Sequence, residues 1–297
     1  MIALRPDDPA YPPQLRDLQP NPDPLWVAGD PAVFALPAVA IVGTRRMSPY
    51  GERVATELAG ALAAAGIVVV SGLAQGIDTA AHRASIDRGG RSVAVLGEGL
   101  TSHAVAVRGR RRVLATRLEA GGALVSQYAP ELPPQGWMFA KRNAIIAALG
   151  AAVVIVEAPF GSGALITAAD ARSLRRPLYA IPGPLGARGS EGTNGLIANG
   201  LATALVDPAV LVARFGGPLP STSAPAEVGE PLLELLAFGP ADFDDLARSI
   251  GGDRAMVRGR IVALLLDGRI RETGDGRFSR AELSSATAVR PLVAPSD

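Results

Sequence analysis

Three short apolar runs in this chain each end in a glycine-containing turn that leads into a helix. The runs and their turns are 39–42 with 43–46, 67–70 with 71–76, and 152–156 with 157–163. Runs rich in β-branched residues are typical of strands that are buried in a parallel sheet. The carboxyl ends of parallel strands meet at one edge of the sheet, where ligands of open α/β proteins bind. The sequence therefore predicts that the three turns form a single ligand-binding edge.

These turns combine two features that favour anions. Glycine lets the backbone approach a ligand closely, and the N–H groups at a helix start have no partner inside the helix. The turns lack the residue order of a Walker loop and the clean GxGxxG spacing of a dinucleotide-binding motif. The pattern indicates a site for phosphate groups without identifying the ligand that carries them.

Strands and helices are expected to alternate along residues 39–215. The expected strands lie near 39–42, 67–70, 92–96, 123–126, 152–157, 178–181 and 203–206. The helix after the first strand is framed by Ser48 and Pro49, which are typical of a helix start, and by Gly66, which is typical of a helix end. This alternation predicts an α/β fold, namely an extended Rossmann-like parallel sheet with helices on both faces.

Composition divides the chain into five segments. Residues 1–38 are rich in proline and aspartate and are expected to pack as a lead-in segment on the core of 39–215. Residues 216–230 have the composition of a linker, and 282–297 are expected to be a disordered tail. Residues 231–281 show the pattern of three helices and a hairpin, which predicts a small C-terminal winged-helix domain.

The distribution of charge indicates that the middle of the chain is the binding region. The whole chain has a net charge of +1, but residues 41–215 hold 18 basic and 11 acidic residues, a net charge of +7. Such an excess attracts a polyanion. The chain has no cysteine and no apolar run long enough to span a membrane. A cytoplasmic protein without a bound metal or cofactor is therefore expected.

Several side chains near the three turns are candidates for contacts with phosphate. Arg45 and Arg46 follow the first strand directly, and paired arginines there either face solvent or bind phosphate bidentately. Lys141, the one lysine among 29 basic residues, and Arg142 are further candidates. Phe139 is a candidate for stacking on a base, although Phe139 and Trp137 could instead anchor the core. The predicted contact residues are Gly43, Thr44, Arg45, Arg46, Ser71, Gly72, Gln75, Gly76, Asp78, Phe139, Lys141, Arg142, Asn143, Gly161, Ser162, Gly163 and Thr167.

One acidic residue and two histidines near this edge have alternative interpretations. Asp78 is expected to cap the helix that follows its turn, and a role in orienting a ligand is also open. His82 lies one helical turn later, where a hydrogen bond to a neighbour is favoured over catalysis. His103 lies in a stretch that is expected to be irregular, with no partner in view. Because the sequence shows no hydrolytic or redox motif, an enzyme is not expected.

The motifs, taken in order, resemble those of one known family. They are GTR at 43–45, SGLAQGIDTAAH at 71–82, AVLGEGL at 94–100, FxKRN at 139–143, VVIVEAPFGSGALITAADA at 153–171 and IPGP…GTNGLIANG at 181–200. Residues 10–215 thereby look like the DprA/Smf family, the DNA-processing proteins of natural transformation. The resemblance implies a core that binds single-stranded DNA, a homodimer, and loading of the RecA recombinase onto incoming DNA. The chain departs from the usual family pattern at 99–112, at Gln127 and at Ala144.

Two other functions are open from the sequence. A nucleotide phosphoribohydrolase on a related Rossmann scaffold would need an acid to activate water, and Glu157 and Asp78 are the candidates. A winged-helix transcriptional regulator would read duplex DNA, but residues 231–281 hold 8 arginines and 8 acids, whereas such modules normally carry excess positive charge. The residues that are expected to form a dimer surface, unless they pack internally, are Leu196, Ile197, Leu201, Val210, Leu211, Val212 and Phe215.

Overall fold

The structure is a computed structural model that describes residues 1–216, 231–236, 239–250, 254–266, 268–273 and 276–281. The chain forms two compact units, Met1–Pro220 and Ser221–Asp297. Most of the predicted linker and all of the predicted tail lie outside the described residues.

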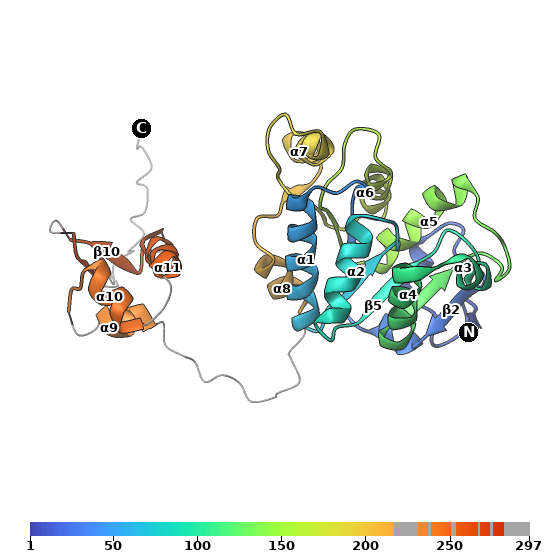
Figure 1. Ribbon diagram of the computed structural model, residues 1–297, viewed down its shortest axis with the longest axis horizontal. Coiled ribbons are helices and arrows are strands. Elements are labelled where there is room, and N and C mark those ends of the chain that lie inside the picture. Colours follow the sequence, from blue (N-terminus) through green and yellow to red (C-terminus); the bar gives the residue numbers. More distant parts are fainter. Residues whose placement is uncertain (217–230, 237–238, 251–253, 267, 274–275, 282–297) are drawn as a thin grey trace, which may run out of the picture. The chain divides into compact units, whose positions relative to one another are not determined.

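The first unit is built on one sheet of nine strands in the order β1-β2-β6-β5-β4-β3-β7-β8-β9 (Figure 1). The strands are β1 (Ile2–Leu4), β2 (Leu25–Gly29), β3 (Ala38–Val42), β4 (Val68–Ser71), β5 (Ser92–Val95), β6 (Ala123–Ser126), β7 (Ala152–Ile155), β8 (Leu178–Ala180) and β9 (Thr203–Ala204). All pairings from β6 to β9 are parallel, whereas β1–β2 and β2–β6 are antiparallel. The predicted strands and the parallel sheet are confirmed, and β1 is an addition that the sequence did not indicate.

The strand order places the three glycine turns side by side. β3 lies between β4 and β7, and both pairings are parallel. The turns that follow these three strands therefore leave the sheet at the same edge, as predicted. The site described below is built at this edge.

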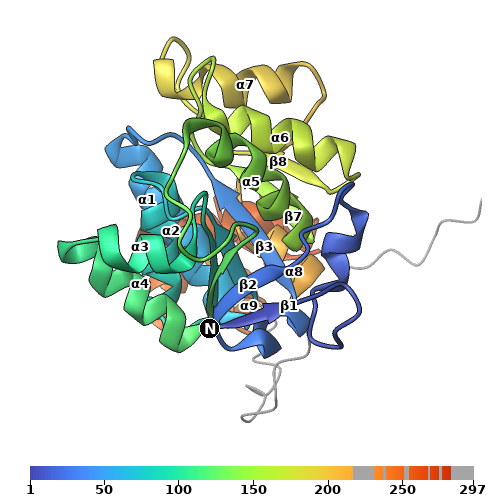
Figure 2. The same cartoon turned by 90° about the vertical axis from the view of Figure 1, so that its right-hand side faces the viewer.

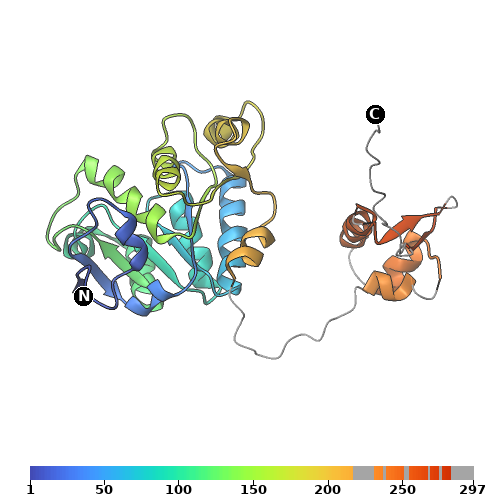
Figure 3. The same ribbon diagram turned by 180° about the vertical axis from the view of Figure 1, so that it is seen from behind.

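Helices cover both faces of the sheet (Figure 2). They are α1 (Pro49–Ala64), α2 (Ile77–Asp87), α3 (Leu100–Ala106), α4 (Gly109–Gly121), α5 (Gly136–Leu149), α6 (Gly163–Ser173), α7 (Glu191–Ala198) and α8 (Ala209–Phe215), with 3-10 helices η1 (Pro13–Asp17), η2 (Pro31–Ala35) and η3 (Arg188–Ser190). Helices α1, α2 and α8 share one apolar core, whereas α5, α6, η1 and η2 share another. In Figure 3 the N-terminal segment with η1 lies beside α5. Sheet strands buried between two helical layers explain why these runs are apolar throughout.

Alternation along β3 shows how the sheet separates the two cores. Val39 and Ile41 pack with α1 and α2, while Ala40 and Val42 pack with α5 and α6. Successive side chains of a strand point to opposite faces, so a single run serves both layers. Burial of each large apolar side chain contributes about 1.5–3 kcal/mol to folding.

Residues at the end of the core pack largely inside the first unit. Leu211 is buried in the core of α1, and Val212 and Phe215 pack against the same core. Leu201 and Val210 remain exposed. Leu196 packs against the other core, so the internal interpretation holds for four of the residues that the sequence assigned to a dimer surface, and the homodimer remains a prediction.

The second unit contains three helices followed by a two-stranded antiparallel sheet. These are α9 (Pro231–Leu236), α10 (Phe243–Ile250), α11 (Arg254–Leu266), β10 (Ile270–Glu272) and β11 (Phe278–Arg280). Their core includes Leu232, Leu246, Val257, Ile261 and Leu264. The order of elements is the one that the sequence indicated, and the winged-helix assignment stays a prediction.

Candidate functional site

A hollow of about 390 Å³ opens where the turns after β3 and β7 meet the start of α5. We call it the main hollow. Its walls come from segments that are far apart in the sequence but adjacent at the carboxyl edge of the sheet. Its lining includes Gly43, Thr44, Arg45, Arg46, Asp78, Phe139, Arg142, Asn143, Phe160, Gly161, Ser162, Gly163, Ile166 and Thr167.

The turn after β3 is held in place by the segment after β7. The Thr44 amide donates to the carbonyl oxygen of Glu157 at 2.7 Å. The amide and hydroxyl of Ser48 donate to the two carboxylate oxygens of Glu157 at 2.9 and 2.5 Å. Between these anchors Arg45 and Arg46 are exposed at the hollow, and the Arg45 guanidinium lies 5.7 Å from the ring centroid of Phe139. The backbone is thus fixed while the two cationic side chains face solvent.

The turn after β7 supplies the start of a helix. Ser162 caps α6, since its hydroxyl accepts from the Ala164 amide at 3.3 Å. Gly161 has a φ of 75°, a conformation that favours glycine. A side chain at Gly161 or Gly163 would meet no neighbour within 4 Å, so the space above both residues is open. A helix start with open space before it is suited to a phosphate group.

The turn after β4 is mainly structural, which corrects two sequence interpretations. Ser71 is fully buried, and its hydroxyl donates to the Ile41 carbonyl at 2.6 Å, so this side chain is not exposed to a ligand. Asp78 does not cap α2, because Gly76 holds the N-cap position. The Asp78 carboxylate instead accepts from the Gly72 amide at 3.2 Å. Burial raises the pKa of Asp78, while Arg142 and nearby backbone amides act in the opposite direction.

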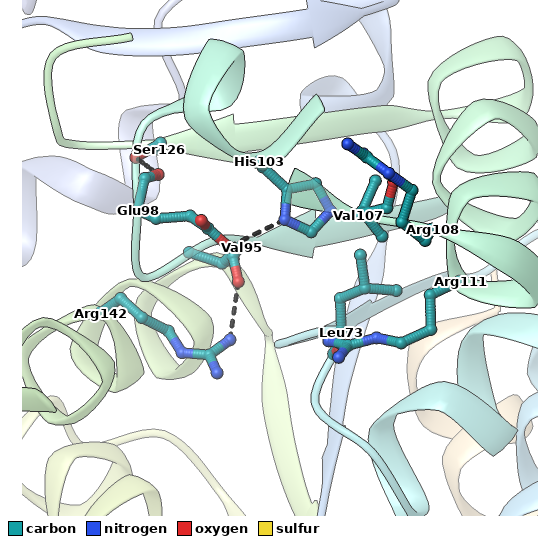
Figure 4. Close-up of polar contacts among 9 residues, drawn as sticks. All are labelled: Leu73, Val95, Glu98, His103, Val107, Arg108, Arg111, Ser126 and Arg142. Atoms are coloured by element: carbon teal, nitrogen blue, oxygen red, sulfur yellow. Dashed lines mark hydrogen bonds and ion pairs between the residues drawn. The ribbon is translucent and has the colours of Figure 1, made fainter. Parts of the chain in front are cut away.

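Arg142 is buried rather than free to meet phosphate. Its guanidinium donates to the Val95 carbonyl at 2.6 Å (Figure 4), and the residue as a whole is only 4% exposed. Burial lowers its pKa, and the nearby Asp78 charge opposes that shift. Arg142 therefore ties α5 to the end of β5 and adds positive charge beneath the hollow. The adjacent Asn143 orients the start of α6, since its side-chain amide donates to Gly163 O at 3.2 Å.

A second hollow of about 210 Å³ lies beside the first, at the ends of β4 and β5. We call it the second hollow. It shares Arg45, Ala74, Phe139 and Arg142 with the main hollow, and adds Gly72, Leu73, Gln75, Leu96, Gly97, Glu98, His103 and Arg111. His103 is not in an irregular stretch without a partner. It lies on α3, and its Nδ1 is 2.8 Å from a Glu98 carboxylate oxygen (Figure 4).

Most predicted contact residues line one of the two hollows, but three do not. Ser71 is buried, Gly76 packs against the backbone of the β3 turn, and Lys141 is exposed on α5 outside both hollows. The Lys141 ammonium lies 6.0 Å from the ring centroid of Trp137. Trp137 itself is 54% exposed and lies within α5, so it is not a core anchor.

The sequence interpretation missed aromatic and charged residues at these hollows. Phe160, which precedes Gly161, lines the main hollow and is 71% exposed. The position of Phe160 directly before the Gly161-Ser162-Gly163 turn is a sequence signal that could have identified it as a candidate. Glu98 was not singled out, and Arg111 was interpreted only as part of a solvent-facing basic run that adds to the positive field, because the approach of both residues to the β4 turn depends on the placement of α3 and α4.

Among the described residues near the main hollow, no free acidic side chain lies beside a nucleophile. Glu157 is engaged by Ser48, and Asp78 is buried against Gly72. Among the residues that the structure describes, no group of three or more His, Asp or Glu side chains could hold a metal ion. No helix within the same residues is long and apolar enough to cross a membrane.

The parallel sheet and its glycine-lined cationic edge define a Rossmann-like α/β protein. The family model for DNA recombination-mediator protein A matches residues 3–216. The chain belongs to this family.

Relatives and solved structures support the assignment. Protein Smf of Escherichia coli (strain K12) is 42% identical over 65% of this chain and 51% of its own length, so the chain spans about half of that relative. A putative DNA processing protein DprA of Mycobacterium tuberculosis is 37% identical over 87% of this chain and 68% of its own. The structure of DprA from Streptococcus pneumoniae is similar with a TM-score of 0.66 at 33% identity, over 72% of this chain and 74% of that one. A structure on the single-stranded DNA binding mode of Helicobacter pylori DprA matches with a TM-score of 0.63 at 27% identity, over 72% of this chain and 94% of that one.

Proposed function

We propose that this chain binds single-stranded DNA at the main hollow and delivers it to the RecA recombinase during transformation and recombination. The observation that carries the proposal is the pairing of exposed Arg45 and Arg46 with the open start of α6 across one hollow. Guanidinium groups and helix amides both bind phosphate, and the exposed Phe160 and the half-buried Phe139 offer faces for base stacking. The similar structure of Helicobacter pylori DprA, which concerns the binding mode of single-stranded DNA, supports the same ligand.

Delivery to RecA and homodimer formation rest on family membership rather than on the geometry of the hollows. Leu201 and Val210 are exposed apolar residues at the end of the core that suit contact with a second copy. Light scattering at micromolar concentration tests this part of the proposal. A monomer under these conditions would remove the homodimer from it.

Nucleotide hydrolysis fits the same edge less well. The acid that would activate water is engaged elsewhere, because both carboxylate oxygens of Glu157 accept hydrogen bonds from Ser48. Turnover of a nucleoside monophosphate by the purified chain would favour this alternative over DNA binding.

Fluorescence anisotropy with a labelled oligo-dT and increasing salt tests DNA binding directly. The logarithm of affinity should fall linearly with the logarithm of salt, with a slope of roughly 0.7 per phosphate neutralised. Arg45→Ala should weaken binding about tenfold, equal to about 1.4 kcal/mol, and reduce the slope by about one. Lys141→Ala should have a smaller effect, since Lys141 lies outside the hollow and would meet only the strand leaving it.

Arg83→Ala is the matched control for these variants. Arg83 is exposed on α2 and lines neither hollow, so the same loss of charge should leave affinity nearly unchanged. Thermal unfolding should be unaffected in Arg45→Ala and Lys141→Ala because both side chains are exposed. Equal binding by Arg45→Ala and wild type would place the site elsewhere, whereas a flat salt response would refute binding through phosphates.

The second unit is expected to be an accessory element rather than the main DNA reader. Two of its described acids are held in local ion pairs, with Asp244–Arg254 at 2.5 Å and Asp245–Arg248 at 2.6 Å. Arg254 and Arg258 lie 4.9 and 5.2 Å from the ring centroid of Phe243. These contacts leave little excess positive charge for phosphate contacts on α10 and α11.

Truncation after Gly217 should therefore lower affinity for single-stranded DNA by less than about tenfold, which is about 1.4 kcal/mol. The measurement is the same anisotropy titration on the full and truncated chains. A loss of several hundredfold, or a strong preference of the full chain for duplex DNA that truncation removes, would show that the second unit is a primary reader.

A further inference from the structure

The second hollow is chemically different from the main hollow. Its walls hold an acid beside cations, because Glu98 and Arg111 face the same space as Arg45. Arg111 is oriented by the β4 turn, since its Nη2 donates to the Leu73 carbonyl at 3.2 Å (Figure 4). A phosphate would meet repulsion from Glu98 here. The hollow therefore fits a neutral group with hydrogen-bonding edges better than it fits a second phosphate.

Glu98 is held in one orientation. One carboxylate oxygen lies 2.8 Å from Nδ1 of His103, and since an ionised carboxylate only accepts, the imidazole must donate from Nδ1. The backbone carbonyl of Glu98 accepts from the Ser126 hydroxyl at 2.7 Å. The side chain is only 15% exposed, and no donor among the described residues contacts its second oxygen. The structure thus presents one fixed, unused acceptor to the second hollow.

The other walls suit a flat ring. The half-buried Phe139 ring supplies apolar surface and also lines the main hollow, whereas Leu73 and Leu96 line the second hollow but are only 2% and 3% exposed. The Arg45 guanidinium lies over Phe139 between the two hollows. A strand whose phosphate is bound by Arg45 can therefore turn one base toward Leu96 and Glu98. Enzymes and binding proteins recognise such extruded bases by stacking and by hydrogen bonds to the Watson–Crick edge.

We propose that the second hollow binds one pyrimidine base of the bound strand and selects cytosine through Glu98. The 4-amino group of cytosine donates to the unused carboxylate oxygen, whereas thymine places a carbonyl oxygen at the same position and is repelled. The volume of about 210 Å³, smaller than the 390 Å³ of the main hollow, leaves room for one base. This inference rests on the proposed function, because it requires that the main hollow holds single-stranded DNA.

The test compares labelled oligo-dC and oligo-dT of equal length by fluorescence anisotropy at mildly alkaline pH, where oligo-dC stays single-stranded. The wild type should bind oligo-dC roughly five- to tenfold more tightly, within the range for one base-specific contact. Equal affinity for the two oligomers would overturn the inference and leave the proposed function intact. Absence of salt-dependent binding to either oligomer would instead refute the proposed function.

Glu98→Gln isolates the acceptor. The amide oxygen can keep the hydrogen bond from His103, so the side chain stays in place while an N–H donor replaces the unused oxygen. The preference should disappear or reverse toward oligo-dT, because thymine now offers an acceptor to that donor. Glu131→Gln is the matched control, since Glu131 is exposed and lines neither hollow, and it should keep the wild-type preference. An unchanged oligo-dC preference in Glu98→Gln would overturn the assignment of Glu98.

Discussion

Replacement of Gly76 by alanine should lower both the stability of the first unit and its affinity for single-stranded DNA. Gly76 is the N-cap of α2 and has φ of 90° and ψ of −132°, a conformation that is essentially restricted to glycine. A Cβ atom there would overlap the Thr44 carbonyl oxygen and lie 2.8 Å from the carbonyl carbon of Arg45. Because the obstacle is backbone, the turn after β3 would have to move.

The expected loss in free energy of unfolding is about 2–4 kcal/mol, since backbone strain and overpacking each cost about 1–3 kcal/mol. Affinity for oligo-dT should fall about tenfold or more, equal to about 1.4 kcal/mol or more, because Thr44 and Arg45 line the main hollow. Denaturant unfolding and anisotropy on the same preparation measure the two effects.

Gly66→Ala is the control that separates the effect of backbone strain from the effect of moving the turn after β3. Gly66 follows α1 with φ of 71°, but a Cβ atom there would meet nothing within 4 Å, and the residue precedes β4 at the opposite edge of the sheet. This variant should lose about 1 kcal/mol through strain alone and keep its affinity for DNA. Similar losses of stability and affinity in both variants would show that contact between the β3 and β4 turns does not shape the site.

The common edge of the three turns could be predicted because it depends only on strand type and direction. β-branched runs such as 67–70 indicate buried parallel strands whichever neighbours they have, and parallel strands end at one edge. The position of Arg45 directly after β3 placed it at the hollow for the same reason. Arg45 thus illustrates a site residue that local sequence could identify.

The roles of Ser71 and Arg142 could not be predicted from their neighbours in sequence. Ser71 donates to Ile41 on the adjacent strand, and Arg142 donates to Val95 at the end of β5. Both contacts depend on which strands become neighbours, which local sequence does not reveal. The pairing of His103 with Glu98 was missed because the stretch after 98 was not expected to form a helix.

Acidification should destabilise the first unit through His82. The Ser92 hydroxyl donates its one proton to the Val69 carbonyl at 2.7 Å, so it must accept from Nδ1 of His82, also at 2.7 Å. Nε2 is then unprotonated, and it is buried with no hydrogen-bond partner. Burial, with a contribution from the Arg142 charge, lowers the pKa of His82 from 6.5 to about 3.

The sign of the effect follows from the depressed pKa. Above pH 6.5 His82 is neutral in both the folded and the unfolded chain, and its full contribution to the stability of the folded state is present. As pH falls from 6.5 toward 3, only the unfolded chain takes up the proton, so the free energy of unfolding decreases. Near pH 5 the loss from this residue should be about 2 kcal/mol. Burial raises the pKa of Asp78, so Asp78 contributes a change of opposite sign.

His82→Asn measures the contribution of His82 alone, since its amide can still donate to Ser92 but cannot be protonated in this range. The variant starts with lower stability because the ring is lost, yet its difference from wild type should shrink by about 2 kcal/mol between about pH 7.5 and about pH 5. Asp78 is present in both proteins, so its contribution cancels. Tryptophan fluorescence follows the first unit specifically, because Trp26 and Trp137 are the two tryptophans of the chain and both belong to that unit. Parallel pH profiles for the two proteins would mean that native His82 takes up its proton over the same pH range as the unfolded chain, and the lowered pKa of His82 would then be wrong.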